Sequence, residues 1–355
     1  MTQTTPAGPP RSPRGSFLGE VKDAVTPRAT LLVLGVIALQ LLFIASYVGA
    51  LHDPKPKDVP FGVVAPPAAT GQTVARLERL PGSPLDPRAV ADEATARQQI
   101  MDREIDGALV VNPGGGRDTL LVASGGGTVL ASTLESLVTR LEQAEGRTLR
   151  TVDVAPASPQ DFDGLSSFYL VVGWCVGGYL CASILAISTG ARPANPRRAS
   201  IRLIAMALVS VVGGLGGAVI IGPILGALPG SVAALWGLGA LTTFAVGAAT
   251  LALQGVFGVV GIGLAILLVV IAGNPSAGGA FPLPMLPPFW EAIGPALPPG
   301  AGTWAARSIA YFEGNALTGP LLVLSAWAAG GVLVTMLAAG LRRRRQDEEL
   351  PTQVA

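Results

Sequence analysis

The side chains that could do chemistry are few and scattered in this sequence. Histidine occurs once, as His52, which leaves no second imidazole for a histidine-rich metal site or proton relay. The two cysteines, Cys175 and Cys181, lie six residues apart in one apolar run, so a helix would point them to different sides. We expect buried thiols rather than a disulfide or metal ligands. The sequence therefore predicts neither an enzyme nor a cofactor or metal site.

A glycine-rich stretch at 121–127, reading LVASGGG, precedes a helical pattern and superficially resembles a turn that holds phosphate. It lacks the lysine of GxxxxGK[ST] and the spacing of GxGxxG, and the same holds for Gly114–Gly116. Both stretches are interpreted as plain loops.

Three charged residues occur in an otherwise apolar, proline-broken segment near the C-terminus: Glu291, Arg307 and Glu313. Charge near the membrane interior is costly and is usually retained for function, so these residues are the candidates for an outer gate. The alternative is that they lie in water at the interface or pair with one another.

The composition divides the chain into a part that suits lipid and a part that suits water. Half of the 355 residues are hydrophobic and only 13% are charged. Residues 203–290 contain no Lys, Arg, Asp or Glu, whereas residues 52–164 carry 11 basic and 16 acidic side chains. Two solvents are implied, lipid for one part and water for the other.

Six apolar runs predict an α-helical membrane bundle of six spans, arranged as one span, a long inserted α/β domain and five more spans. The spans are expected at 29–51, 166–189, 203–227, 231–253, 255–273 and 318–341. Turns at Leu228-Pro229-Gly230 and Gln254-Gly255 separate some of them. The first run could instead be a signal peptide cleaved near Val48-Gly49-Ala50, but its 23 residues exceed a usual signal core.

Basic residues in the short loops predict the orientation. They cluster before the first span, between the second and third, and after the sixth: Arg11, Arg14, Lys22, Arg28; Arg192, Arg197, Arg198, Arg202; and Arg342 to Arg345. By the positive-inside rule, all of these segments face the cytoplasm. The sequence thus predicts a multi-pass plasma-membrane protein with both tails, 1–28 and 342–355, inside and the 52–164 domain outside.

The predicted outer domain alternates strand and helix patterns. Strands are expected at 60–65, 107–111, 119–123 and 149–154. Asp86-Pro87 is a typical N-cap and first-turn pair for a helix to about residue 105, and a second apolar helical face follows. That face consists of Leu130, Leu134, Leu137, Val138 and Leu141.

Two further segments are expected to be short helices at the membrane. Before the first span, Ser16 could cap a helix with one apolar face that lies on the inner leaflet. Within the 165–341 membrane region, residues 281–316 contain too many prolines for one span and predict two re-entrant helices at 288–293 and 303–312. GxxxG pairs at 173/177, 213/217 and 222/226 predict close helix packing.

This layout resembles the type-2 ABC-exporter permeases, and within them the phage-infection-protein (YhgE/Pip) and nitrosoguanidine-resistance branch. The resemblance rests on the topology and on IDGALVVNP (105–113), DFDGLSSFYLVVGW (161–174) and the proline-rich 281–314 segment. It implies a flat inner helix at 16–27, re-entrant helices at 288–312 that close the outer end, and an ATPase-coupling segment at 190–202. The coupling segment departs from the family pattern in being short and in carrying Pro193 and Pro196.

The resemblance implies an export permease that works with a separate ABC ATPase subunit as a homodimer or a heterodimer. Arg192, Arg197, Arg198 and Arg202 are the ATPase-docking candidates. An uncharged interior suits an amphiphilic or lipid-like cargo, and nothing points to nucleic acid. The alternative is a non-transporting envelope protein whose outer domain binds a surface partner such as cell wall or phage.

Overall fold

The computed structural model describes residues 26–349 and divides into two units, residues 1–44 and 45–355. Most of the apolar helix α2 (Pro27–Leu51) belongs to the first unit. The helix expected from Ser16 lies outside the described residues.

Residues 59–153 form a five-stranded mixed sheet with strand order β2-β1-β3-β4-β5. The strands are β1 (Val59–Val64), β2 (Leu85–Ala89), β3 (Gly107–Val110), β4 (Arg117–Val122) and β5 (Thr148–Asp153). Only β3 and β4 pair antiparallel; the other neighbours are parallel. We call this part, with its helices, the sheet domain.

Helices cover both faces of the sheet. Helices α3 (Pro67–Glu78) and α5 (Thr128–Ala144) pack on one face around Phe61, Leu77 and Leu134. Helix α4 (Glu93–Met101) packs on the other around Ile100 and Leu121. Leu120 and Leu121 enter opposite cores because successive strand residues point to opposite faces.

The four predicted strands and the predicted 130–141 helical face are confirmed, but the prediction at Asp86-Pro87 was wrong. Those residues lie in β2, which pairs with β1, and the following helix starts later. Asp92 is its N-cap and accepts a hydrogen bond from the Thr95 backbone N–H at 2.8 Å. Proline is tolerated in β2 because an edge strand leaves one row of its N–H groups unpaired.

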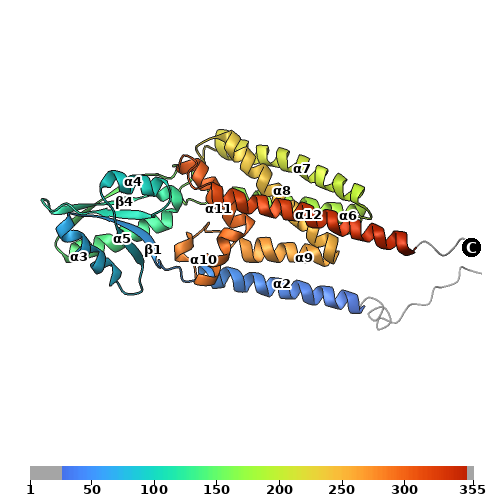
Figure 1. The fold of residues 1–355 in the computed structure, drawn as a ribbon. Helices are drawn as coiled ribbons and strands as arrows, with labels where there is room; N and C mark the ends of the chain where they lie inside the picture. The colour runs from blue at the N-terminus through green and yellow to red at the C-terminus, as the bar shows by residue number, and fades with distance from the viewer. Residues whose placement is uncertain (1–25, 350–355) are drawn as a thin grey trace, which may run out of the picture. The chain divides into compact units, whose positions relative to one another are not determined.

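The membrane region is a bundle around α8 (Val232–Phe257), which packs against α6 (Ser166–Thr189), α7 (Pro196–Val219) and α12 (Thr318–Glu349) (Figure 1). Local signals set the boundaries. Asn195 and Ser231 cap α7 and α8, and the left-handed Gly258 (φ +67°) ends α8. The turn at 228–230 is confirmed, whereas the turn predicted at Gln254-Gly255 falls three residues later, because both residues continue α8.

Five helices of the described residues are long and apolar enough to cross a membrane: α2, α6, α7 with its π-helical extension Ile220–Ile224, α8 and α12. The helix at the predicted fifth span, α9 (Val260–Ile266) with the π-helix Leu267–Gly273, has only 14 residues. A straight helix of that length rises about 21 Å, less than a hydrocarbon core of about 30 Å. A mostly helical membrane protein with a small α/β sheet is therefore confirmed, and six full spans are not.

After the π-helix the chain turns through short helices, as predicted for residues 281–316. These are a 3-10 turn (Leu283–Met285), α10 (Pro288–Ile293), a second 3-10 turn (Gly294–Ala296) and α11 (Pro298–Tyr311). Helix α10 matches the prediction, and α11 begins five residues before the predicted Thr303. We call the end of the bundle that carries α10 and α11 the sheet end.

Glycines allow close helix packing, but mostly not at the predicted pairs. A Cβ at Gly173, Gly177 or Gly213 would meet nothing within 4 Å. At Gly178 and Gly214 it would lie 2.6 Å and 2.5 Å from backbone atoms of α8. Of the predicted positions, Gly217 is tightly packed, because a Cβ there would press against the indole of Trp174 in α6. The contacts of Gly178 and Gly214 fall one residue from a predicted glycine, and a one-residue step along a helix turns the contact surface by about 100°.

Candidate functional site: a chamber and a lateral groove

A chamber of about 700 Å³ lies between the sheet domain and the sheet end of the bundle. The sheet domain contributes Arg103 and Asp106, the re-entrant helices contribute Glu291 and Arg307, and α12 contributes Val323. Proline, glycine and alanine residues supply much of the remaining wall, so the chamber combines charged groups with apolar surface. Such a lining suits a ligand with one polar and one apolar part.

Arg103 joins the sheet domain to the re-entrant helices. It follows α4 in a left-handed conformation (φ +59°), and its guanidinium carbon lies 3.4 Å from the ring centre of Trp304. It donates hydrogen bonds to the Trp304 carbonyl and the Ser308 Oγ, both at 2.9 Å. The ring of Phe312 is 4.7 Å away. Stacking and directed hydrogen bonds together use the planar shape of arginine, which lysine lacks.

Asp106 brings a titratable carboxyl to the same chamber. Burial raises the pKa of Asp106 to about 6, although the charge of Arg103 partly offsets this effect. Burial also lowers the pKa of Arg103, and the neighbouring charge of Arg307 lowers it further. The chamber lining therefore includes two arginines and four carboxyls, those of Asp58, Glu104, Asp106 and Glu291, and the carboxyl of Asp106 can change charge near neutral pH.

Arg307 is buried and holds the irregular backbone around the chamber. Its guanidinium donates to the carbonyls of Gly278 (2.7 Å), Gly279 (2.8 Å) and Gly164 (3.1 Å). These carbonyls belong to segments without regular secondary structure, so they need donors from elsewhere. Arg307 thus ties the linker before α6 to the re-entrant segment.

The linker itself binds α11 through Asp161, within the DFDG sequence. Asp161 is buried, accepts a hydrogen bond from the Tyr311 hydroxyl at 2.8 Å, and accepts another from the Ser166 backbone N–H at 2.8 Å. One carboxylate therefore satisfies an orphan N–H at the start of α6 and anchors the end of α11.

Sequence reasoning missed the role of the glycine run Gly125–Gly127. A Cβ on Gly125 would lie 2.5 Å from the Tyr311 ring, and one on Gly127 would overlap the ring of Pro282. The run is therefore a packing surface on which the re-entrant helices rest, not a plain loop. Three consecutive glycines were the available signal, but the partner residues lie more than 150 positions away in the chain.

The structure separates the three predicted gate residues. Glu291 and Arg307 line the chamber, whereas Glu313 is exposed in the turn after α11, in a left-handed conformation (φ +56°), and is not part of the lining. No ion pair between any two of the three is found among the described residues. The predicted pairing among them is therefore absent from that part of the chain.

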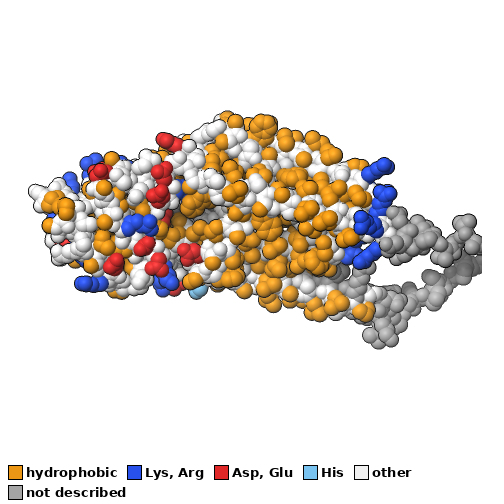
Figure 2. All heavy atoms as spheres, in the orientation of Figure 1, with side chains coloured by type: hydrophobic (Ala, Val, Ile, Leu, Met, Phe, Trp, Pro, Cys, Tyr) orange, Lys and Arg blue, Asp and Glu red, His pale blue; other side chains and the backbone are white. Residues whose placement is uncertain are grey.

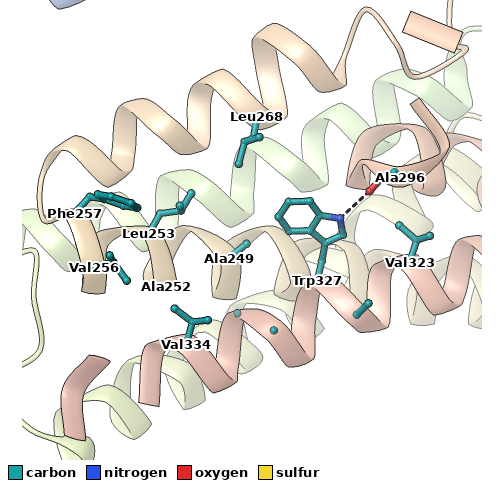
Figure 3. Close-up of a pocket in the computed structure, with 13 residues that line it drawn as sticks. Ala249, Ala252, Leu253, Val256, Phe257, Leu268, Ala296, Val323, Trp327 and Val334 are labelled. Carbon is teal, nitrogen blue, oxygen red and sulfur yellow. Dashed lines mark hydrogen bonds between the residues drawn. The ribbon is translucent and has the colours of Figure 1, made fainter. Parts of the chain in front are cut away.

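A second cavity, of about 530 Å³, is a groove on the side of the bundle between α8, the π-helix Leu267–Gly273 and α12 (Figure 3). The side chains that line it are apolar, and the indole N–H of Trp327 is already bonded to the Ala296 carbonyl at 2.9 Å. Val323 lines both the groove and the chamber. The two cavities are therefore neighbours that share this wall residue.

The four predicted docking arginines fall into two groups at the opposite end of the bundle. Arg197 and Arg198 are exposed at the start of α7, where they are free to meet a partner. Arg202 is buried and donates to the carbonyls of Thr189 and Gly190, which close the end of α6. Arg192 is exposed and donates to the Val256 carbonyl at 3.0 Å.

Figure 2 shows basic side chains gathered at the end of the bundle where α12 ends, an apolar surface over the bundle, and charges of both signs over the sheet domain. Among the side chains that the structure describes, no group of three or more His, Cys, Asp or Glu could hold a metal ion. Comparisons with models of protein families, with curated proteins and with solved structures found no match.

Proposed function

We propose that this chain is the membrane subunit of an ABC-type exporter that moves an amphiphilic or lipid-like compound outward, with energy from a separate ATPase. The observation that carries the proposal is that Val323 lines both the apolar groove and the partly charged chamber. An amphiphile could keep its apolar part in the groove while its polar part reaches the arginines of the chamber.

The bundle supports a cargo of this kind rather than an ion. Residues 203–290 carry no ionisable Lys, Arg, Asp, Glu or His side chain, and an ion- or proton-driven carrier needs such groups at membrane depth. The sequence also contains no GxxxxGK[ST] motif, so ATP hydrolysis would have to occur on another polypeptide.

Arg197 and Arg198 are the proposed contacts with that ATPase. Both are exposed, and neither takes part in an ion pair within the described part of the chain. Arg192 and Arg202 would act indirectly, because they hold the ends of α8 and α6 beside the same loop. Charged pairs at an interface rim chiefly guide association, so charge reversal should weaken the complex strongly.

The test is co-purification of the tagged full chain from native membranes in mild detergent, followed by identification of bound proteins and an ATPase assay. We expect a stoichiometric ATPase with the wild-type chain and its loss with the double variant Arg197→Glu/Arg198→Glu. Arg79→Glu/Arg140→Glu is the matched control, because it makes the same charge change at exposed sites of the sheet domain.

Two results would contradict the proposal. One is recovery of the chain without a nucleotide-binding partner under conditions that keep a known ABC complex intact. The other is equal loss of the ATPase in the control variant. The first result would favour a surface-binding role for residues 52–164, and the sheet domain would then be the part to test against cell-wall material.

A further inference from the structure

The lateral groove has the dimensions and chemistry of a site for a lipid chain. It follows α12 from Val323 to Val334, a rise of about 17 Å, which is close to half of a hydrocarbon core of about 30 Å. Leu253, Phe257, Leu268 and other apolar residues form its walls (Figure 3). A groove of one-leaflet depth that opens sideways in a bilayer faces acyl chains, not water.

Arg192 and Arg342 lie where α8 ends, at the end of the groove away from the chamber, which we call the arginine end. Arg192 donates to the carbonyl of Val256, itself a groove residue, at 3.0 Å, and Arg342 donates to the carbonyl of Gly255 at 3.3 Å. The positive charges of Arg192 and Arg345 also repel that of Arg342. None of the ion pairs formed by the described residues includes Arg192 or Arg342, so their charges are not neutralised there.

The two carbonyl contacts have a structural role that leaves most donors available. Gly255 and Val256 lie in the last turn of α8, whose carbonyls lack partners within the helix and attract cations. Each guanidinium carries five N–H donors, and each of these contacts uses one. The remaining donors suit a phosphate, which guanidinium groups bind in a bidentate manner.

We propose that the groove binds one anionic phospholipid, with an acyl chain along α8 and α12 and its phosphate held by Arg192 and Arg342. By the positive-inside rule this end faces the cytoplasm, so the lipid comes from the inner leaflet. Like-charged arginines favour a headgroup with net negative charge over a zwitterionic one. Binding rests on the groove alone; only a role for this lipid as cargo would rest on the proposed export function.

The experiment measures lipid binding to the full chain and involves neither ATPase nor transport. The purified protein is titrated with phosphatidylglycerol or with phosphatidylcholine of the same acyl chains, and the bound fraction is read by native mass spectrometry. We expect a preference of about tenfold or more for phosphatidylglycerol, since each basic residue near an anionic surface adds to the attraction.

Two variants separate the contribution of the groove, which binds the acyl chain, from that of the arginines, which bind the headgroup. Gly330 lines the groove, and a Cβ there would meet nothing within 4 Å, so Gly330→Leu should fill the groove without disturbing the helix. It should lower the binding of both lipids about tenfold. Arg192→Gln/Arg342→Gln should abolish the preference, so that phosphatidylglycerol binds no better than phosphatidylcholine. Gly213→Leu on α7 is the control, because Gly213 is exposed, lies outside the groove and has equally open space.

Three outcomes would overturn the proposal. They are equal binding of the two lipids by the wild-type chain, wild-type binding by Gly330→Leu, and loss of a dimer rather than of lipid in Gly330→Leu. The last would mean that a second copy of the chain covers the groove. The melting temperature of each variant shows whether a loss of binding reflects a loss of fold.

Discussion

Glu142 is the residue in the sheet domain whose charge is most difficult to accommodate. Its side chain is 1% exposed and lies 3.3 Å from Arg76 and 3.4 Å from Arg147. Arg147, however, is mainly bound to Asp118, with a 2.7 Å bond from its Nε. Burial, together with a hydrogen bond to Asp118, raises the pKa of Glu142 to about 7. The hydrogen bond from Arg147 helps to lower the pKa of Asp118. Between the two pKa values, Glu142 therefore keeps its proton whereas Asp118 is ionised.

The raised pKa of Glu142 predicts that the stability of the sheet domain depends on pH. The pKa of Glu142 is raised from 4.5 to about 7 on folding, so the folded state binds the extra proton between these values. The contribution of Glu142 to stability is therefore fully present below pH 4.5 and is lost as the pH rises through about 7. Glu142→Gln should remove that loss.

Hydrogen exchange of the β4 and α5 amides between pH 5 and 8, corrected for intrinsic exchange, measures this effect. Exposed Glu78→Gln is the control and should keep the wild-type slope. A slope in Glu142→Gln equal to that of the wild type would show that another group is responsible.

At the scale of elements, the glycine run before α5 determines how closely the sheet domain approaches α11. Gly125→Ala and Gly127→Ala would each place a methyl group against Tyr311 or Pro282, and such overpacking costs about 1 to 3 kcal/mol. We expect lower melting temperatures and faster hydrogen exchange in α11 for both variants.

Gly71→Ala provides the matched control for these substitutions. Gly71 lies in α3, where an added Cβ meets nothing within 4 Å, so alanine should stabilise the helix by up to about 1 kcal/mol. Equal melting temperatures for Gly127→Ala and Gly71→Ala would mean that the contact with Pro282 is loose and that the glycine run has no packing role.

The elements differ in how far the sequence could predict them. Apolar periodicity identified the long helices, α5 and four of the five strands, because each has its own burial pattern. Strand β2 was missed, since Asp86-Pro87 matches a helix start, and only its position at the sheet edge permits a proline. Gly125–Gly127 and Arg103 could not be assigned for a different reason. Their partners, Tyr311 and Trp304, are brought near only by the tertiary fold.

At the scale of the whole molecule, contacts in the structure place two of the three predicted cytoplasmic segments together. Arg192, from the loop before α7, and Arg342, near the end of α12, both bind the last turn of α8. The segment before the first span lies largely outside the described residues. Because α12 starts at the sheet end and finishes beside Arg192, the short α9 and the turns after it must return the chain across the bundle.

This arrangement predicts that the sheet domain and the arginine end lie on opposite sides of the membrane. Ser136→Cys places a thiol on an exposed face of α5, and Arg344→Cys places one at the exposed end of α12. In intact cells, a membrane-impermeant maleimide should label Ser136→Cys and not Arg344→Cys, because basic segments are retained in the cytoplasm. After permeabilisation both should react.

The unsubstituted chain is the background control, since Cys175 is buried and Cys181 lies half-buried within α6. If Arg344→Cys but not Ser136→Cys is labelled in intact cells, the orientation is the reverse of the predicted one and the proposed lipid site lies in the outer leaflet. If both are labelled in intact cells, the short α9 does not carry the chain across the membrane.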